Sequence, residues 1–444
     1  MTPPVPTATL NDIDVTATAA TNGERSVSIQ CAGKWWRRLF SFLGPGYLVA
    51  VGYMDPGNWA TDLAGGSAYG YSLMWILALS SGMAMLLQVL AARLGIVAQA
   101  DLAQLCRRHS SPRSSAVQWI LCEVAICACD LAEVIGSAIA LNMLFAIPLS
   151  YGVVLTVFDV FAILWLEKRG FRYLEAFIIS LLGIVCICFG INLLLAQPQW
   201  FAVAAGLLPS RAVLADPNML YLAIGIIGAT VMPHNLYLHS STVQTRRIQP
   251  GDEAKRSAIR FATIDIVLAL CLAALVNAAI LITAAAVFHT AGHTEVAELQ
   301  DAYRLLGPLT GQMLAGVLFS VALLAAGLSS SVTATLAGQI VMEGFVELKF
   351  SPSTRRLITR AIAIVPAFFV TLRFGEGGIA KLLILSQVIL SLQLPFATLP
   401  LIRFTASKKI MGRFASSPLL TGLAVAAMIV MAGLNVLLIW KTFS

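Results

Sequence analysis

Charged residues are scarce in this chain, and their scarcity decides its class. Only 11% of its 444 residues are Asp, Glu, Lys or Arg, and 58% are hydrophobic, whereas a soluble domain carries about 25% charged residues. The 29 basic and 22 acidic residues are too few to cover a water-soluble surface of this size. The composition therefore excludes a soluble protein and predicts an all-α integral membrane protein.

Two further features are missing. The eight cysteines include no C-x-x-C pair, because the close pairs are Cys127 with Cys129 and Cys186 with Cys188; we interpret them as small buried side chains and not as zinc ligands. The first 33 residues contain no apolar run, so we do not expect them to act as a cleavable signal peptide. Residues 1–40 are instead predicted to form a disordered cytoplasmic tail.

Long charge-free runs supply the membrane spans, since a transmembrane helix needs roughly 20 largely apolar residues. Eight such runs are long enough, and three weaker apolar segments, around Asp55, around Asp130 and at 355–373, complete a set of eleven. The eleven helices are expected near 41–69, 72–95, 115–146, 151–166, 173–195, 218–245, 257–289, 309–345, 355–373, 379–403 and 416–440.

The basic residues support this count. Twenty-four of the 29 Lys and Arg residues fall in alternate connecting segments, and short cytoplasmic loops collect Lys and Arg. This alternation predicts a multi-pass protein of the plasma (inner) membrane, with the N-terminus cytoplasmic and the C-terminus outside. The formal charge of +7 is then a signal of topology, and we expect no nucleic-acid partner.

Two of the expected spans are interrupted near their middles. The first contains Asp55-Pro56-Gly57-Asn58 and the sixth contains Met232-Pro233-His234-Asn235. A proline kink often only shapes packing, but a mid-membrane carboxylate without a partner costs at least about 2.5–3.5 kcal/mol. Broken helices at corresponding places in two sets of five predict a transporter with inverted repeats and a midplane site. Residues 41–405 would form this ten-helix core, and 406–444 an eleventh helix with a short external C-terminus.

The side chains at the two breaks suit a cation. Asp55 offers a carboxylate, Asn58 an amide oxygen and Met232 a thioether. Oxygen ligands alone would also suit Mg²⁺ or Ca²⁺, whereas the soft sulfur favours Mn²⁺, Fe²⁺ and later metals. Methionine is also a common filler of apolar cores, so packing is the alternative role of Met232.

Ionisable groups at membrane depth suggest a proton path. The third span carries Glu123, Asp130 and Glu133, and the last two are three residues apart and share a helix face. His234 titrates near neutral pH when unperturbed. A structural ion pair between helices is the alternative for Asp130 and Glu133.

Several motifs together resemble one family. They are Gly44-Pro45-Gly46 before Asp55-Pro56-Gly57-Asn58, Gly65-Gly66 with Tyr69-Gly70-Tyr71, Met232-Pro233-His234-Asn235 with His239-Ser240, and Gly338-Gln339 with Glu343-Gly344. From about residue 40 to 405 the chain resembles the natural resistance-associated macrophage protein (Nramp) family of divalent-metal transporters. The resemblance implies a LeuT-type 5+5 inverted repeat and import of Mn²⁺, Fe²⁺, Cd²⁺ and related divalent metals, coupled to protons by alternating access.

The same resemblance implies roles for particular residues. Further metal ligands would be the carbonyls of Gly52 and Ala229 and the amide of Gln387, although Gly52 stands where many members have alanine. A proton relay would join Asp55, Asp130, Glu133 and His234. Its ion-pair partners would come from the arginines on the cytoplasmic side, Arg246, Arg355, Arg356 and Arg360.

Two other functions remain as alternatives. A sodium-coupled symporter of amino acids or organic solutes with the same fold would present a bare helix end to the substrate's carboxylate, and Asp55 argues against it. An intramembrane metalloenzyme would need a third ligand beside His234 and His239, and none is evident. We therefore expect a transporter and not an enzyme, without a resident cofactor, embedded in lipid and working as a monomer.

Overall fold

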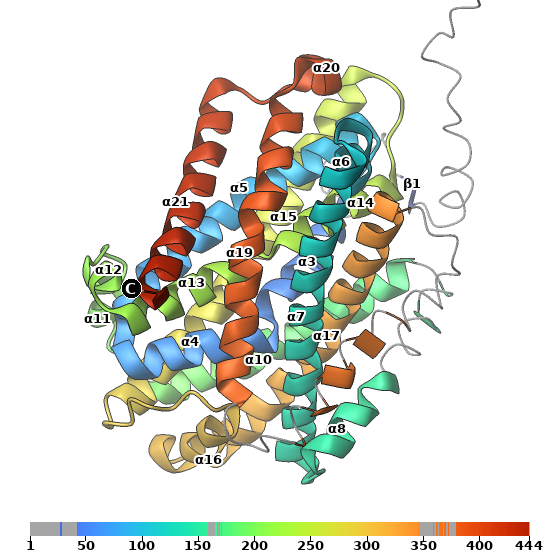
Figure 1. Cartoon of the computed structure of the whole chain (residues 1–444). Helices are drawn as coiled ribbons and strands as arrows, with labels where there is room; N and C mark the ends of the chain where they lie inside the picture. Colours follow the sequence, from blue (N-terminus) through green and yellow to red (C-terminus); the bar gives the residue numbers. More distant parts are fainter. Residues whose placement is uncertain are drawn as a thin grey trace, which may run out of the picture.

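The computed structural model describes residues 27–28, 42–158, 171–346 and 379–443, together with 165–166, 169 and scattered positions from 358 to 372. This part of the chain is a bundle of long helices (Figure 1). Eight of its helical segments are long and apolar enough to cross a membrane. The expectation of a multi-pass helical membrane protein is therefore confirmed.

The helices follow the predicted spans closely. In chain order they are α3 (Pro45–Ala50), α4 (Pro56–Tyr69), α5 (Met74–Ala98), α6 (Leu102–His109), α7 (Pro112–Phe145), α8 (Leu149–Leu155), α10 (Phe171–Ala196), α11 (Trp200–Ala205), α12 (Ala212–Ala215), α13 (Pro217–Val231), α14 (Pro233–Thr242), α15 (Asp252–Ala284), α16 (Leu299–Thr310), α17 (Leu314–Val346), α19 (Ile379–Ala406), α20 (Lys408–Met411) and α21 (Pro418–Phe443). Short 3-10 segments join some of them: η1 (Val51–Met54), η2 (Gly70–Leu73), η3 (Val243–Thr245) and η5 (Gly412–Phe414), and the π-helix η4 (Ala285–His289) extends α15.

Some boundaries differ from the prediction. The eighth helix was expected to start at 309, but 309–310 end the amphipathic helix α16, and Gly311, with φ of 68°, turns the chain before α17 begins at Leu314. The expected helix at 355–373 and the end of 151–166 lie largely outside the described residues. The count of eleven spans therefore remains a prediction.

The connecting segments gather at two ends of the bundle. At one end, β1 (Val27–Ser28) pairs in parallel with β2 (Arg246–Arg247), and Arg413 forms an ion pair with Asp252. At the other end, Lys441 near the C-terminus donates hydrogen bonds to the carbonyls of Leu214 and Ala215, the last two residues of α12. Figure 1 accordingly shows the C-terminus beside α12, away from α20.

The short strand β1 lies within the segment expected to be disordered. Residues 27–28 add to the edge formed by β2, just after the sixth span. The rest of 1–40 lies outside the described residues. At least these two residues of the tail therefore have a defined place.

The last helix is bonded to α19. The side-chain amide nitrogen of Asn435 in α21 donates to the backbone carbonyl of Ser391 at 2.8 Å, and the Ser391 hydroxyl donates to the side-chain oxygen Asn435 Oδ1 at 2.9 Å. Both side chains are buried. This pair attaches α21 to α19 four residues beyond Gln387.

Candidate metal site

The first break forms because the chain cannot continue as a helix through Pro56. Pro56 lacks an N–H, so the carbonyl of Gly52, four residues earlier, loses its usual helical donor. Asp55 is extended, with φ of −67° and ψ of 163°, and its Oδ1 accepts a hydrogen bond from the Asn58 N–H at 2.8 Å. Asp55 thus caps α4 at the point where the helix restarts.

The second break repeats this arrangement. Pro233 stands four residues after Ala229 and removes the helical donor to the Ala229 carbonyl. Met232 lies between α13 and α14 with φ of 37° and ψ of 100°, a strained conformation for a residue that is not glycine. Asn235 holds it there, because its N–H donates to the Met232 carbonyl at 3.2 Å and its amide nitrogen to the Met232 sulfur at 3.4 Å.

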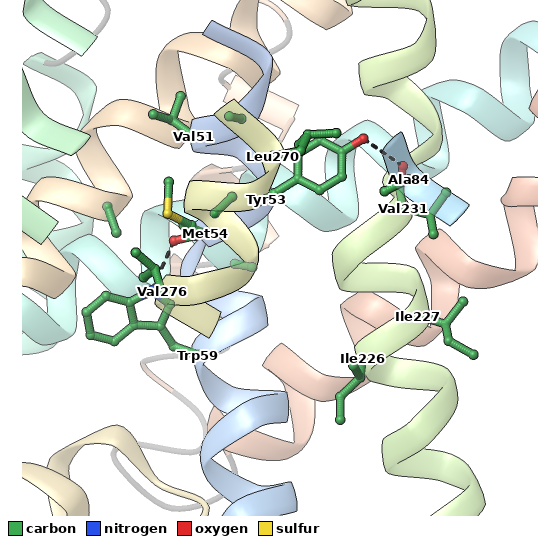
Figure 2. Close-up of a cluster of buried hydrophobic side chains, with 14 of the residues drawn as sticks. Val51, Tyr53, Met54, Trp59, Ala84, Ile226, Ile227, Val231, Leu270 and Val276 are labelled. Carbon is green, nitrogen blue, oxygen red and sulfur yellow. Dashed lines mark hydrogen bonds between the residues drawn. The ribbon is translucent and has the colours of Figure 1, made fainter. Parts of the chain in front are cut away.

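Tyr53 ties the two breaks together. Its hydroxyl donates to the carbonyl of Val231, one residue before Met232, at 3.2 Å (Figure 2). Its own carbonyl accepts hydrogen bonds from the amide nitrogens of Asn58 and Asn277, at 2.7 and 2.8 Å. Both the hydroxyl and the carbonyl of Tyr53 therefore hold the unwound turn in place. The side-chain oxygen of Asn58 takes no part in these bonds.

Gln387 of α19 reaches the first break. Its amide nitrogen lies 3.5 Å from Asp55 Oδ2. A side chain at Gly57 would overlap the Gln387 amide, and one at Gly228 would overlap the Gln387 carbonyl. Glycine at these two positions therefore lets α19 approach both broken helices.

The donor atoms gathered here are buried and incompletely bonded. Asp55, Asn58, Met232 and Gln387 are each at most 1% exposed. The oxygens Asn58 Oδ1 and Gln387 Oε1 have no hydrogen-bond partner in the described part of the chain. Buried polar atoms are nearly always satisfied, so these oxygens are suited to a ligand that brings positive charge.

The donor set fits a transported cation. It offers one carboxylate, two amide oxygens, one thioether and two backbone carbonyls without helical donors. No group of three or more His, Cys, Asp or Glu side chains within the described ranges could hold an ion. A site with a single formal charge suits reversible binding better than permanent retention.

The acidic residues of α7 divide into two groups. Asp130 and Glu133 are buried, and Glu133 Oε1 lies 3.6 Å from the sulfur of Cys129, which in turn lies 3.8 Å from Asp55 Oδ2. Glu123 is farther along the helix, and its carboxylate accepts a hydrogen bond from the Trp119 indole at 3.0 Å. The structure therefore brings Glu133, but not Glu123, next to the metal site.

His234 is fully buried at the start of α14. Neither of its ring nitrogens has a hydrogen-bond partner among the residues that the structure describes. His239, one and a half turns later, instead bonds through Nδ1 to the Gln88 carbonyl oxygen at 2.9 Å, and the Gln88 amide donates to the Tyr53 hydroxyl at 2.7 Å. His239 thus belongs to the network that holds Tyr53.

Arg246 lies away from the acids of α7. Its guanidinium donates to Glu175 Oε1 of α10 at 2.6 Å and to the Leu43 carbonyl at 3.0 Å. Asp265 of α15 accepts the Gly46 N–H at 2.7 Å beside it. These contacts fix the N-terminus of α3. Arg355, Arg356 and Arg360 lie outside the described residues.

Sequence reasoning missed Glu175, Asp265 and Cys129 as parts of these networks. Glu175 is a buried acid near the start of α10, and Asp265 is a buried acid near the middle of α15. An isolated acid beside an otherwise apolar span was the available signal, because such an acid needs a partner. Cys129 gave no signal in the sequence, since its neighbours Asp55 and Glu133 meet only in three dimensions.

Comparisons with known proteins agree with this fold and site. The family model described as "Natural resistance-associated macrophage protein-like" matches residues 46–441. A divalent metal cation transporter, MntH, of Bradyrhizobium diazoefficiens is 56% identical over 414 residues, which are 93% of this chain and 92% of the relative. The MntH of Nostoc sp. is 53% identical over 418 residues, or 94% of this chain and 95% of the relative.

Solved structures give the same result. The manganese transporter of Eremococcus coleocola, in complex with an aromatic bis-isothiourea substituted compound, superimposes with a TM-score of 0.85 at 40% identity, over 93% of this chain and 88% of that one. The nucleobase-cation-symport transporter Mhp1 matches at a TM-score of 0.59 and 15% identity, over 94% of this chain and 90% of that one. This second likeness reflects the LeuT-type fold alone. The chain belongs to the Nramp family of membrane transporters and is not an enzyme.

Proposed function

We propose that this protein carries divalent transition-metal cations, Mn²⁺ foremost, across the membrane through the site between its two broken helices. The observation that carries the proposal is the contact of Asn58 and Gln387 with the buried carboxylate of Asp55. Cys129, whose sulfur also lies beside this carboxylate, packs in one cluster with Met232. Fe²⁺ and Cd²⁺ would share the site, because the thioether favours them over Ca²⁺ and Mg²⁺.

The names of the relatives support this choice. The MntH relatives are divalent metal cation transporters, and the Eremococcus coleocola protein is a manganese transporter. They resemble this chain over most of its length. The carboxylate and the sulfur at the helix breaks favour the same class of substrate, divalent transition-metal cations.

The competing function is a sodium-coupled symporter of organic solutes. Such a protein would leave the positive N-terminal end of α4 free for a substrate carboxylate. Here Asp55 Oδ1 already accepts the Asn58 N–H at that end. A second carboxylate at the same place would be repelled, so a cation is the better substrate.

We further propose coupling to protons through Glu133, Asp130 and His234. Glu133 is separated from Asp55 only by the Cys129 sulfur, and His234 follows Met232 by two residues. Ionisable groups buried at membrane depth are typical of proton relays. Glu123, which accepts a hydrogen bond from Trp119, would lie at the end of this path that is farther from Asp55.

Alternating access would require α3 to move. All four donor side chains of the site are buried, so an aqueous path has to open at each face in turn. The bonds from Asp265 and Arg246 to the start of α3 are suited to hold the end that carries β2 closed. With the N-terminus cytoplasmic, this end would face the cell interior and the C-terminus would lie outside.

Uptake by purified protein in liposomes tests the function. Mn²⁺ entry is expected down a proton gradient, with strong competition from Cd²⁺ and weak competition from Ca²⁺ or an amino-acid mixture. Internal acidification should accompany Mn²⁺ entry. Amino-acid uptake driven by Na⁺, without Mn²⁺ uptake, would establish the competing function.

A further inference from the structure

We propose that Cys129 is a second sulfur donor at the cation site and that it raises the preference of the site for thiophilic cations such as Cd²⁺ over Mn²⁺. The proposal rests on the proposed function, because it assigns a further ligand to the same site. It concerns a residue whose sequence context indicated only a small buried side chain.

The Cys129 sulfur lies beside the carboxylate of Asp55. Cys129 Sγ lies 3.8 Å from Asp55 Oδ2, and the Gln387 amide nitrogen lies 3.5 Å from the same oxygen. The thiol and the amide therefore flank the carboxylate oxygen that a cation would contact. Cys129 is 1% exposed, so solvent does not compete for its sulfur.

A second sulfur-bearing side chain, Met232, belongs to the same cluster as Cys129. Cys129 and Met232 pack in one small apolar cluster with Ala125, Ala128, Ala334 and Leu390. The two residues come from different elements, α7 and the break between α13 and α14. A cation bound at Asp55 would thus have a sulfur available from each, which favours soft metals.

Two amide oxygens of the candidate site are unsatisfied within the described residues. Gln387 Oε1 and Asn58 Oδ1 are buried without hydrogen-bond partners in the described part of the chain. Gln387 contacts Asp55 through its side-chain amide nitrogen, and Asn58 contacts it through its backbone N–H. Cys129 is therefore not an isolated cysteine, since it borders a set of donors that lacks a positive partner.

Coordination by sulfur requires the thiolate. As the Cys129 S–H bond breaks and a Cd–S bond forms, the proton needs an acceptor. Glu133 Oε1, 3.6 Å from Sγ, is placed to take it as an O–H bond. No oxidation or reduction is involved, and loss of Cd²⁺ reverses the step.

The test compares Cys129→Ser with the wild type and with Cys127→Ser as the matched control. Cys127 is half-buried on the same helix, about 200° away around its axis. Calorimetry in detergent should show that Cys129→Ser weakens Cd²⁺ binding by about tenfold or more, as loss of a group at a metal site does, and changes Mn²⁺ binding by less than about twofold. Cys127→Ser should leave both affinities unchanged.

An optical measurement supplies a second readout. Titration of the wild type with Cd²⁺ should produce a thiolate-to-cadmium charge-transfer band in the ultraviolet, absent from Cys129→Ser and retained in Cys127→Ser. An unchanged Cd²⁺-to-Mn²⁺ affinity ratio, or a band that persists in Cys129→Ser, would refute the role of Cys129. Failure of the wild type to bind either metal would instead refute the proposed function.

Discussion

Met232 occupies a conformation that a packing residue has no need to adopt. Its φ of 37° places it in a region that side chains rarely occupy, and such strain persists where the surroundings impose it. The cluster around it is small and consists largely of alanine. At this scale the question is whether the sulfur binds the cation or only fills space.

Met232→Ala separates these two roles. If the sulfur is a ligand, Mn²⁺ and Cd²⁺ affinity should fall by at least about tenfold, and Ca²⁺ should compete better because the oxygen donors remain. Loss of packing alone would lower stability by about 2–5 kcal/mol and reduce the flux of every ion alike. Uptake competition and thermal unfolding of the same preparation distinguish the outcomes; a normally folded variant that still rejects Ca²⁺ would disprove the role in selectivity.

Substitution of Glu133 or His234 should change proton coupling more than metal affinity. Neither is placed among the ligands, yet the Cys129 sulfur lies close to both Glu133 and Asp55. The two ring nitrogens of His234 have no hydrogen-bond partner among the described residues. Replacing either with Gln or Ala is therefore expected to change the pH dependence of uptake while Mn²⁺ affinity changes little. Parallel records of Mn²⁺ flux and internal acidification provide the check, and unaltered coupling in the double variant would exclude both from the relay.

The short helix α6, which lies outside the membrane spans, contains a buried acid whose effect on stability can be measured. Asp101 caps α6, because its Oδ1 accepts the Gln104 N–H at 2.8 Å. Burial raises the pKa of Asp101 from its ordinary value of 3.8 to about 6. The folded state therefore disfavours the ionised form of Asp101. As the pH rises from about 4 through 6, this lowers the free energy of unfolding.

Asp101→Asn keeps a good cap and removes the charge. We expect the variant to unfold at a higher temperature than the wild type at pH 7.5. The difference should disappear as the pH falls well below 3.8, where the wild-type side chain is neutral in both the folded and the unfolded state. Thermal unfolding of the two proteins in detergent across this pH range measures the effect. A constant offset at every pH would mean that burial of the charge is not its cause.

Elements differ in how far the sequence predicts them. The long spans follow from charge-free runs, and both breaks follow from Asp55-Pro56 and Met232-Pro233, because the signal lies within about 20 consecutive residues. The start of α17 was predicted too early, because the leucines of the preceding helix α16 extend the apolar run up to Gly311. The short helices α6, α11 and α12 were not expected, since they are stabilised mainly by the helices on which they pack.

The residues of the candidate site also differ in how far the sequence predicts them. Asp55, Asn58 and Met232 could be chosen because each lies at a break visible in the sequence. Contacts between distant helices, such as Arg246 with Glu175 or Cys129 with Asp55, have no local pattern. They depend on which helix faces come together, and only the fold supplies that information.

At the scale of the whole molecule, the N-terminal tail has one defined attachment. Only β1, at Val27–Ser28, pairs with the body of the protein in the described part of the tail. Removal of residues 1–24 should therefore leave Mn²⁺ uptake unchanged, since it spares the strand. Removal of 1–30 isolates the contribution of the β1–β2 pairing, which we expect to be small because two residues are involved. A large loss of uptake in the shorter deletion, at equal amounts in the membrane, would assign the tail a part in transport.

Mn²⁺ binding should depend most on Asp55, because its carboxylate supplies the formal negative charge placed against this cation. The decisive measurement is the affinity of purified Asp55→Ala protein for Mn²⁺ by calorimetry, beside the wild type and Asp301→Ala, a control at an exposed carboxylate on α16. We predict that binding is lost in Asp55→Ala and kept in the control, with both variants unfolding cooperatively. Unchanged Mn²⁺ affinity in a folded Asp55→Ala protein would contradict the placement of the metal between the two broken helices.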